Sequence, residues 1–497
     1  MKYQITLLLS TFISLIQSEV LFVLEHFRHG ATGPSELDKY GKDLMKNTWD
    51  ETEVDELTPI GIRMQYILGL YFADRYKHLI PDKYDPKTIY VSSVNDSKAI
   101  QSAIAHTSAF YFGKSEELND QTKERAIPPA YEMSQELNNT IGNLGKATLP
   151  GRFQTIPIHI FHPYEHDFLL QEEYGDCSAV KEIRESNLET EVFKKIKDEF
   201  ENKYLNLSFW NDSEIINKIS PLEKISLICE DFFVNDANNS TLTLLKEAFN
   251  NDETKFNEFI SSCKEALSAK LFNYTFNSNQ PYFTIITQNQ PMNKMLTYME
   301  KRKNEFIKNC SNNPTQEDLD YTKPKIVIWS GLDSTMAGTQ MFFHLINYGV
   351  EVEAKNISYN NITIYPTYAS SIFIELNWNE TYNETEKCHK NNMTDTNDTE
   401  NYDECFYVNY LINGKSYANY TYNFFKKVLN KKFMDDDVMD NYCNFKLVTK
   451  NDGMFLIVCI VFVVIILIGS VCSSMYFFNG IRKTENRKSI VGPLDIV

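Results

Sequence analysis

The sequence lacks any dense block of lysines and arginines, although the chain has 497 residues and 49 basic side chains. Aspartates and glutamates outnumber them at 67, so the formal net charge is -18. A protein that binds nucleic acid neutralises a run of phosphates with clustered cations. The composition therefore argues against a nucleic-acid partner.

The sequence also lacks the histidine, cysteine and carboxylate spacings that make a closed metal site. His26, His106 and His344 lie in stretches with strand or helix patterns, where packing or surface positions are expected. No internal repeat is evident. We therefore expect no metal and no other cofactor.

An apolar run lies at each end of the chain. Residues 1–18 carry one positive charge and an apolar centre before a small residue, which is typical of a signal peptide. Residues 454–478 carry no charge over a length that spans a bilayer core of about 30 Å, and basic residues follow. These runs predict a type I single-pass membrane protein with an ectodomain at 19–450 and a cytoplasmic tail at 479–497. A buried core helix is the alternative for the second run.

Sequons and cysteines agree with a secretory route. The sequons include Asn95, Asn138, Asn206, Asn211, Asn273, Asn356, Asn361, Asn379, Asn392 and Asn419. Seven cysteines lie in the predicted ectodomain, so an odd one remains after intramolecular pairing. Proximity favours a bond between Cys388 and Cys405. We expect the ectodomain outside the cell or in a lysosomal or vesicular lumen.

The first part of the chain alternates strand and helix patterns. Val20–Leu24 is an apolar strand, and a Thr-Pro pair then starts a helix in "ELTPIGIRMQYILGLYFADRY", from Glu56. Thr88–Ser93 is a second short strand with a helix after it. This alternation predicts a parallel-sheet α/β domain, with ligands bound outside the carboxyl ends of the strands.

A helical lobe interrupts this pattern. From about 178 to 268 the apolar residues have helical spacing, which predicts a cap inserted at about 130–310. The α/β pattern resumes with a strand at Lys325–Ser330 and a helix after it. The segments "SIFIEL", from Ser371, and "CFYVNYLING", from Cys405, read as a hairpin with a long, sequon-rich loop.

Several motifs follow one another in a family order. They are Arg28-His29-Gly30, "ELTPIGIR", "SAIAHTSAFYFG", "SGLDST", "YPTYASSIFIEL" and "VNYLINGK". Together these motifs resemble the histidine acid phosphatases, a branch of the histidine phosphatase superfamily, over about Val20 to Cys443.

The resemblance implies a role for each matching residue. His29 would be the nucleophile that becomes phosphorylated, Asp333 the proton donor to the leaving group, and Arg28 a phosphate ligand. Lys98 stands where the family has a second arginine, and it keeps the charge without the planar fork. The expected ligand would be a phosphate monoester or another small anion.

Two further family positions have lost their charge. Thr32 replaces an arginine, and Leu332 replaces the histidine of a His-Asp pair. Each lost charge-assisted bond costs about 1.5 to 3 kcal/mol, so together the changes could slow the reaction by about 10² to 10⁶. A His-Asp pair at His166 and Asp167 matches a different family segment.

Structural alternatives stand beside these roles. His29 could be a satisfied polar group at a sheet edge, Asp333 a helix N-cap, and Lys98 a solvated helix residue. A glycan at Asn95 would crowd a phosphate pocket.

The resemblance also bears on the disulfides. It implies a bond between Cys177 and Cys443. Cys229 resembles a family half-cystine, but Ser371 stands where its partner would be. This leaves Cys263 or Cys310 as the partner of Cys229.

Two hypotheses remain. In the first, the protein is an acid phosphomonoesterase, weakened at its phosphate pocket. In the second, it is a non-catalytic membrane glycoprotein that binds a ligand or partner through the same cleft. The sequence does not define an oligomeric state.

Overall fold

The computed structural model describes only part of the chain. The described residues are 18–34, 54–127, 134–160, 191–204, 221–238, 246–247, 249–275, 282–310, 324–347, 365–379, 388, 393 and 399–432. The predicted signal peptide before Ser18, the predicted span at 454–478 and the predicted tail at 479–497 lie outside them. None of the helices within the described ranges is long and apolar enough to cross a membrane.

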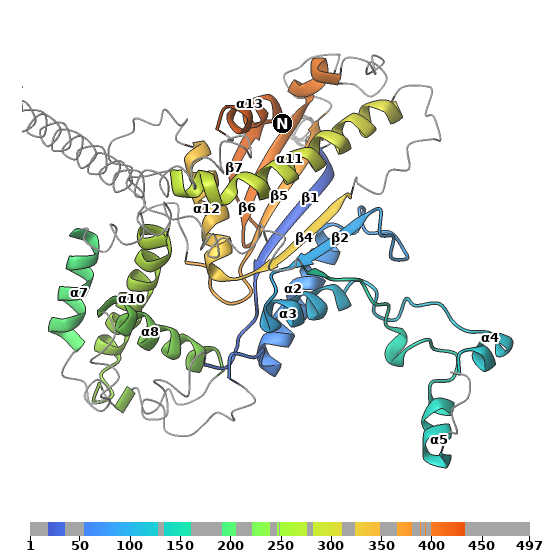
Figure 1. The fold of residues 1–497 in the computed structure, drawn as a ribbon, viewed down its shortest axis with the longest axis horizontal. Helices are drawn as coiled ribbons and strands as arrows, with labels where there is room; N and C mark the ends of the chain where they lie inside the picture. Colours follow the sequence, from blue (N-terminus) through green and yellow to red (C-terminus); the bar gives the residue numbers. More distant parts are fainter. Residues whose placement is uncertain are drawn as a thin grey trace, which may run out of the picture. The chain divides into compact units, whose positions relative to one another are not determined.

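Seven strands form one sheet in the order β3-β2-β4-β1-β5-β6-β7 (Figure 1). The strands are β1 (Ser18–Arg28), β2 (Ile89–Ser93), β3 (His159–Ile160), β4 (Ile326–Gly331), β5 (Ser371–Asn379), β6 (Phe406–Ile412) and β7 (Lys415–Thr421). The first four in the order run parallel to one another, whereas β5, β6 and β7 pair antiparallel.

The α/β fold class is therefore confirmed, with one correction. The sheet is mixed, whereas a parallel sheet was expected. The antiparallel half is a set of sequential neighbours, with β5 paired to β6 and β6 to β7, and antiparallel neighbours need no crossover helix. The predicted hairpin is confirmed as β5 and β6.

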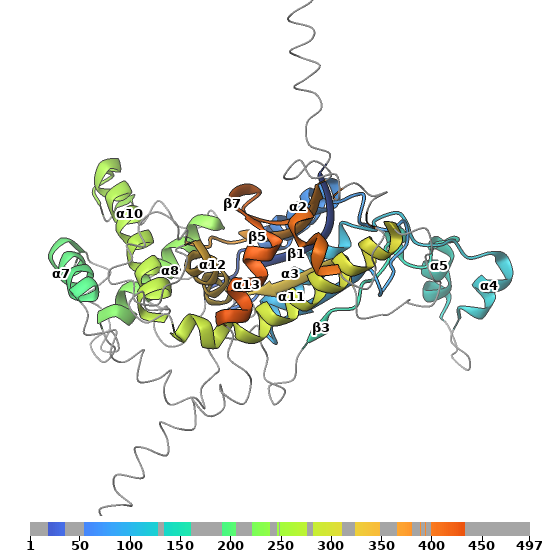
Figure 2. The same ribbon diagram turned by 90° about the horizontal axis from the view of Figure 1, so that it is seen from above.

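Helices cover both faces of the sheet. On one face lie α2 (Pro59–Arg75) and α3 (Ser97–Ser108). On the other lie α11 (Tyr282–Cys310), α12 (Asp333–Asn347) and α13 (Tyr422–Lys432) (Figure 2). Strand β1 serves both cores, because Val23 packs towards α2 while Phe22 and Leu24 pack towards α11. This explains why β1 reads as a continuous apolar run.

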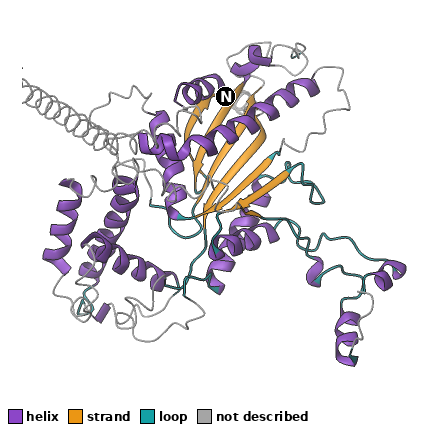
Figure 3. Cartoon of the chain, viewed as in Figure 1, coloured by secondary structure: helices purple, strands orange, loops and turns teal. Residues whose placement is uncertain are grey.

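A helical lobe has its own core. Its helices are α7 (Glu191–Tyr204), α8 (Pro221–Ala237), α10 (Glu253–Ala269) and a π-helix, η7 (Lys270–Thr275), and no strand occurs among its described residues (Figure 3). Phe232, Phe256 and Phe259 pack together, and a disulfide joins Cys229 to Cys263. Of the two partners left open for Cys229, the structure has the first.

Helix α11 lies within the range expected for the cap, about 130–310, but it does not contribute to the core of the helical lobe. Its buried Met292, Met295 and Met299 belong to the core of the sheet, because its apolar stripe faces β1 and β4. The remaining described helices are α4 (Asp120–Arg125), α5 (Gln135–Asn143) and the short 3-10 helices η3 (Pro150–Arg152) and η11 (Thr399–Cys405). The predicted Cys388–Cys405 disulfide is confirmed, whereas Cys177 and Cys443 lie outside the described residues.

Candidate active site

Three strands meet at the edge that carries the Arg-His-Gly triplet. Arg28 ends β1 opposite Gly331, which ends the parallel strand β4. The backbone N–H of His29 donates to the Gly331 carbonyl at 3.1 Å. On the other side of β1, the N–H of Arg28 donates to the Ser370 carbonyl at 3.0 Å, directly before β5. The strand ends therefore fix the backbone on both sides of His29.

Gly30 allows the triplet to lie against α2. A Cβ atom at Gly30 would come within 2.3 Å of the Gly61 carbonyl oxygen, so no side chain fits there. Thr58 caps α2, with Pro59 at its first turn as predicted, and its hydroxyl donates to the Ala31 carbonyl at 3.0 Å. The start of α2 thus holds the turn after His29.

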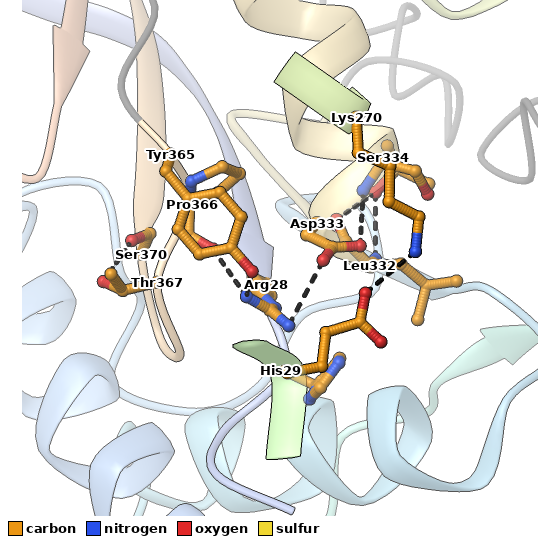
Figure 4. A network of polar contacts seen from close by, with 12 residues as sticks. Arg28, His29, Lys270, Leu332, Asp333, Ser334, Tyr365, Pro366, Thr367 and Ser370 are labelled. Atoms are coloured by element: carbon orange, nitrogen blue, oxygen red, sulfur yellow. Dashed lines mark hydrogen bonds and ion pairs between the residues drawn. The ribbon is translucent and has the colours of Figure 1, made fainter. Parts of the chain in front are cut away.

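A cavity of about 250 Å³ opens at this edge. All four predicted site residues line it, namely Arg28, His29, Lys98 and Asp333. Figure 4 shows Arg28, His29 and Asp333 close together. Thr32 and Leu332, the two positions without a charge, line it as well. The remaining lining residues are Gly33, Asp55, Glu230, Val234, Leu267, Lys270, Leu271, Ser334, Tyr365 and Tyr368.

The imidazole of His29 is held in one orientation. Its Nδ1 lies 2.8 Å from the carbonyl oxygen of Gly30, a contact in which the nitrogen must be the donor. Burial, followed by the charge of Arg28, lowers the pKa of His29 to about 3. The ring is therefore neutral above that pH, with the lone pair on Nε2.

Arg28 is the most constrained cation of the site. Its guanidinium donates to the Pro366 carbonyl at 2.7 Å, lies 4.6 Å from the ring centre of Tyr368, and is 3.3 Å from Oδ2 of Asp333. Tyr365 receives a longer bond of 3.4 Å. These contacts fix the guanidinium in a plane beside His29.

Asp333 uses its two oxygens differently. Oδ1 accepts from the backbone N–H of Ser334 at 2.8 Å in the first turn of α12, whereas Oδ2 faces Arg28. Burial alone would raise the pKa of Asp333, but the charges of Arg28 and Lys270 and the N–H of Ser334 outweigh it and lower that pKa. Asp333 therefore stabilises the first turn of α12 with one oxygen and faces Arg28 in the cavity with the other.

Lys98 is not a solvated helix residue, because its side chain is only 13% exposed. Its Nζ lies 2.9 Å from Oδ1 of Asp55 and 2.9 Å from Oδ2 of Asp96. Burial opposes the charged form, but these two hydrogen bonds raise the pKa of Lys98. The lysine is a cation at the cavity that already has two carboxylate partners.

Among the lining residues without a predicted role, five carry titratable side chains: Asp55, Glu230, Lys270, Tyr365 and Tyr368. The tyrosines occur in "YPTYASSIFIEL", and their place directly before a strand could have marked them. For Glu230 and Lys270 the amphipathic pattern of the lobe gives no such signal.

The three histidines expected at packing or surface positions, His26, His106 and His344, are interior residues. His26 lies 3.0 Å from Oγ1 of Thr335 and 3.1 Å from Oγ1 of Thr339. Nε2 of His106 lies 2.9 Å from a carboxylate oxygen of buried Glu25. His344 is fully buried. His166 and Asp167 lie outside the described residues.

Comparison with known proteins gives partial matches in sequence. Human prostatic acid phosphatase is 25% identical over 182 residues, which are 37% of this chain and 39% of that protein. Lysosomal acid phosphatase of Xenopus laevis is 28% identical over 182 residues, covering 36% of this chain and 35% of that protein. The match thus spans about two-fifths of the length of these relatives.

Among solved structures, Hafnia alvei phytase in complex with tartrate superposes with a TM-score of 0.49 and 12% identity, over 84% of this chain and 98% of that one. The family description that matches the sequence is "Histidine phosphatase superfamily (branch 2)", and it covers residues 34–413, which begin just after the Arg-His-Gly triplet. With most of its length matched, the chain belongs to the histidine phosphatase superfamily, branch 2.

Proposed function

We propose that the protein hydrolyses phosphate monoesters through a phosphohistidine at His29. Asp333 is the proton donor, and Arg28 and Lys98 hold the phosphate. The observation that carries this proposal is the contact of Nδ1 of His29 with the Gly30 carbonyl, which leaves Nε2 as the nucleophile in a cavity shared with Arg28 and Asp333.

The reaction has two balanced steps. In the first, Nε2 of His29 bonds to phosphorus, the bond from phosphorus to the ester oxygen breaks, and Asp333 gives its proton to that oxygen. In the second, water attacks phosphorus, the bond to Nε2 breaks, and Asp333 takes a proton from the water. The products are the alcohol and orthophosphate, and Arg28 stabilises the charge on the phosphoryl oxygens in both steps.

The ionised state of Asp333 in the free site predicts an acidic optimum. Because the pKa of Asp333 is lowered, the proton for the leaving group must arrive with the substrate. A phosphate monoester loses its second proton at a pKa of about 6, so only its monoanion carries that proton into the site. We expect kcat/KM to fall as the pH rises above about 6.

The proposed activity is weak. Thr32 and Leu332 give no charge to the phosphate, and two of the three donors of Lys98 are committed to Asp55 and Asp96. A phosphate must compete with these carboxylates for the same lysine, which lowers its affinity.

The same contacts favour a second candidate, a non-catalytic membrane glycoprotein that binds a ligand through this cavity. Asn95 is exposed three residues before Lys98, and a glycan on it would restrict access to the cavity. In this alternative Arg28, His29 and Asp333 remain as a binding surface.

Hydrolysis of p-nitrophenyl phosphate by the full chain, purified in detergent, tests the two candidates. We expect slow turnover at pH 4 to 6 that is lost in the His29→Ala variant. Alkaline quench after mixing with 32P-labelled substrate should trap label on His29, because the N–P bond of phosphohistidine survives base and is cleaved by acid. A folded protein whose rate equals that of His29→Ala would leave only the binding candidate.

We also propose that the chain is a type I glycoprotein, with a signal peptide at 1–18, a membrane span at 454–478 and a lumenal or extracellular ectodomain. The charge pattern and sequons of the sequence support this. Resistance to carbonate extraction and a mass loss on treatment with peptide N-glycosidase are the expected results. Extraction of the intact chain by carbonate would refute the anchor.

A further inference from the structure

The helical lobe brings an ion pair into the cavity. Nζ of Lys270 lies 2.9 Å from Oε1 of Glu230, and both residues line the cavity. Lys270 is the first residue of the π-helix that follows α10 and Glu230 is on α8, so the pair joins two segments of the lobe. π-Helical turns occur frequently at functional sites.

The pair lies beside the proposed proton donor. Lys270 acts on Asp333, since its charge is one of those that lower the pKa of that carboxyl. Figure 4 draws Lys270 in one network of polar residues with Asp333 and Ser334. Glu230 acts on Tyr365 and Tyr368, because its charge contributes to the raised pKa of both phenols. The pair therefore borders the place where the leaving group would meet Asp333.

We propose that Lys270 and Glu230 bind the leaving group of a zwitterionic phosphate monoester, an O-phosphorylated amino acid of the phosphoserine type. The carboxylate of the amino acid pairs with Lys270, and its ammonium group pairs with Glu230. This inference rests on the proposed function. In the first step phosphorus passes from the serine oxygen to Nε2 of His29, and that oxygen takes the proton of Asp333, which releases serine.

Charge decides between the possible leaving groups. An anionic group would pair with Lys270 but would take that lysine away from Glu230 and leave the carboxylate facing an anion. A group with an ammonium alone would take Glu230 away from Lys270 and leave the lysine facing a cation. An apolar group would cover both charges without replacing their hydration. A zwitterion exchanges one ion pair for two and leaves the net charge unchanged.

The size of the cavity also favours a small leaving group such as an amino acid. The cavity is about 250 Å³, and the phosphoryl group at Arg28 takes part of it. Val234, Leu267 and Leu271 close the lobe side with apolar side chains. The remaining room suits a leaving group of a few heavy atoms, below the size of most ligand pockets.

A matched series of ligands tests the proposal. Phosphoethanolamine is phosphoserine without the carboxylate, 3-phosphooxypropanoate is phosphoserine without the ammonium group, and ethyl phosphate has neither. Binding to the His29→Ala full chain is measured by calorimetry, and kcat/KM is measured with the wild type. We expect phosphoserine to bind about tenfold or more tightly than each partial analogue.

Variants assign the preference to each residue. Glu230→Gln should remove the advantage of phosphoserine over 3-phosphooxypropanoate, and Lys270→Met its advantage over phosphoethanolamine. Lys264→Met, on the exposed side of α10, is the matched control and should keep both. If His29→Ala does not fold, Asp333→Asn serves in its place.

The outcomes separate this inference from the proposed function. If phosphoserine binds more tightly than the three other ligands but the wild type hydrolyses none of them, the enzyme proposal is wrong and the zwitterion site is supported. Turnover of p-nitrophenyl phosphate with equal affinity for the four ligands would overturn the zwitterion site and keep the enzyme. Tightest binding of ethyl phosphate, or of a phosphoserine peptide whose amine is blocked, would also overturn it.

Discussion

The sheet edge and the helical lobe contribute to one cavity in different ways. His29 and Arg28 from the sheet are 4% and 8% exposed, and backbone groups of three strands hold them. The side chains of Lys270 and Glu230 from the lobe are 36% and 31% exposed and hold one another. Buried groups on strand ends have fixed geometry, which chemistry needs, whereas half-exposed groups can exchange partners with a ligand. The comparison suggests that the sheet carries the reaction and the lobe selects the substrate.

The largest effect should come from the sheet. Asp333→Asn removes the proton donor and should lower kcat for p-nitrophenyl phosphate by about 100- to 10,000-fold. The loss should be smaller with 2,4-dinitrophenyl phosphate, because its leaving group needs no proton. Asp74→Asn, on the exposed side of α2, is the matched control. An equal loss with both substrates would show that Asp333 acts by position or charge and not as an acid.

The lobe should respond in stability more than in rate. Replacing Cys229 and Cys263 by alanine opens a loop with a sequence separation of 34, which should cost about 4 kcal/mol of unfolding free energy, measured by urea denaturation. The matched pair Cys388 and Cys405, with a separation of 17, should cost about 3 kcal/mol. If the helical lobe selects the substrate and the sheet edge carries the reaction, replacing Cys229 and Cys263 should raise KM while kcat changes less. A fall in kcat alone would contradict this division.

The Leu332→His variant repairs the sheet edge. A histidine there could donate to a phosphoryl oxygen, and one charge-assisted bond of about 1.5 to 3 kcal/mol should raise kcat/KM about ten- to 100-fold. Leu332 also packs against the core of the sheet, so Leu332→Asn controls for the loss of that packing. No gain in a folded histidine variant would mean that this position does not limit the rate.

The sequence predicted the site residues at the strand ends better than those from the helical lobe, for a physical reason. Arg28, His29 and Asp333 follow buried strands, and strand ends of a parallel pair must meet at one edge. Their apolar strands and the motif order are both visible in the sequence. Lys270 and Glu230 reach the cavity only because α8 and α10 pack together around Cys229 and Cys263, a tertiary arrangement that helical periodicity does not specify. The pairing of β5 with β1 and of β7 with β6 depends in the same way on contacts that the apolar pattern leaves open.

The last prediction concerns the support behind the sheet edge, where the effect is on stability and not on rate. His26 is fully buried against Thr335 and Thr339, and burial lowers its pKa to about 3. An unfolded histidine binds a proton below its ordinary pKa of about 6.5, whereas the folded His26 stays neutral down to about pH 3. Folding therefore loses about 1.4 kcal/mol of stability per pH unit from this group as the pH falls from about 6.5 towards 3.

His26→Gln keeps a polar side chain without that titration, so its unfolding free energy should fall less steeply between pH 6.5 and 4 than that of the wild type. Urea denaturation at four pH values measures the slope, and exposed His78→Gln is the matched control. An unchanged slope in His26→Gln would mean that His26 is protonated in the folded protein. In that case both ring nitrogens of His26 would donate to the hydroxyls of Thr335 and Thr339, and His26 would add a buried charge against the helix that begins at Asp333.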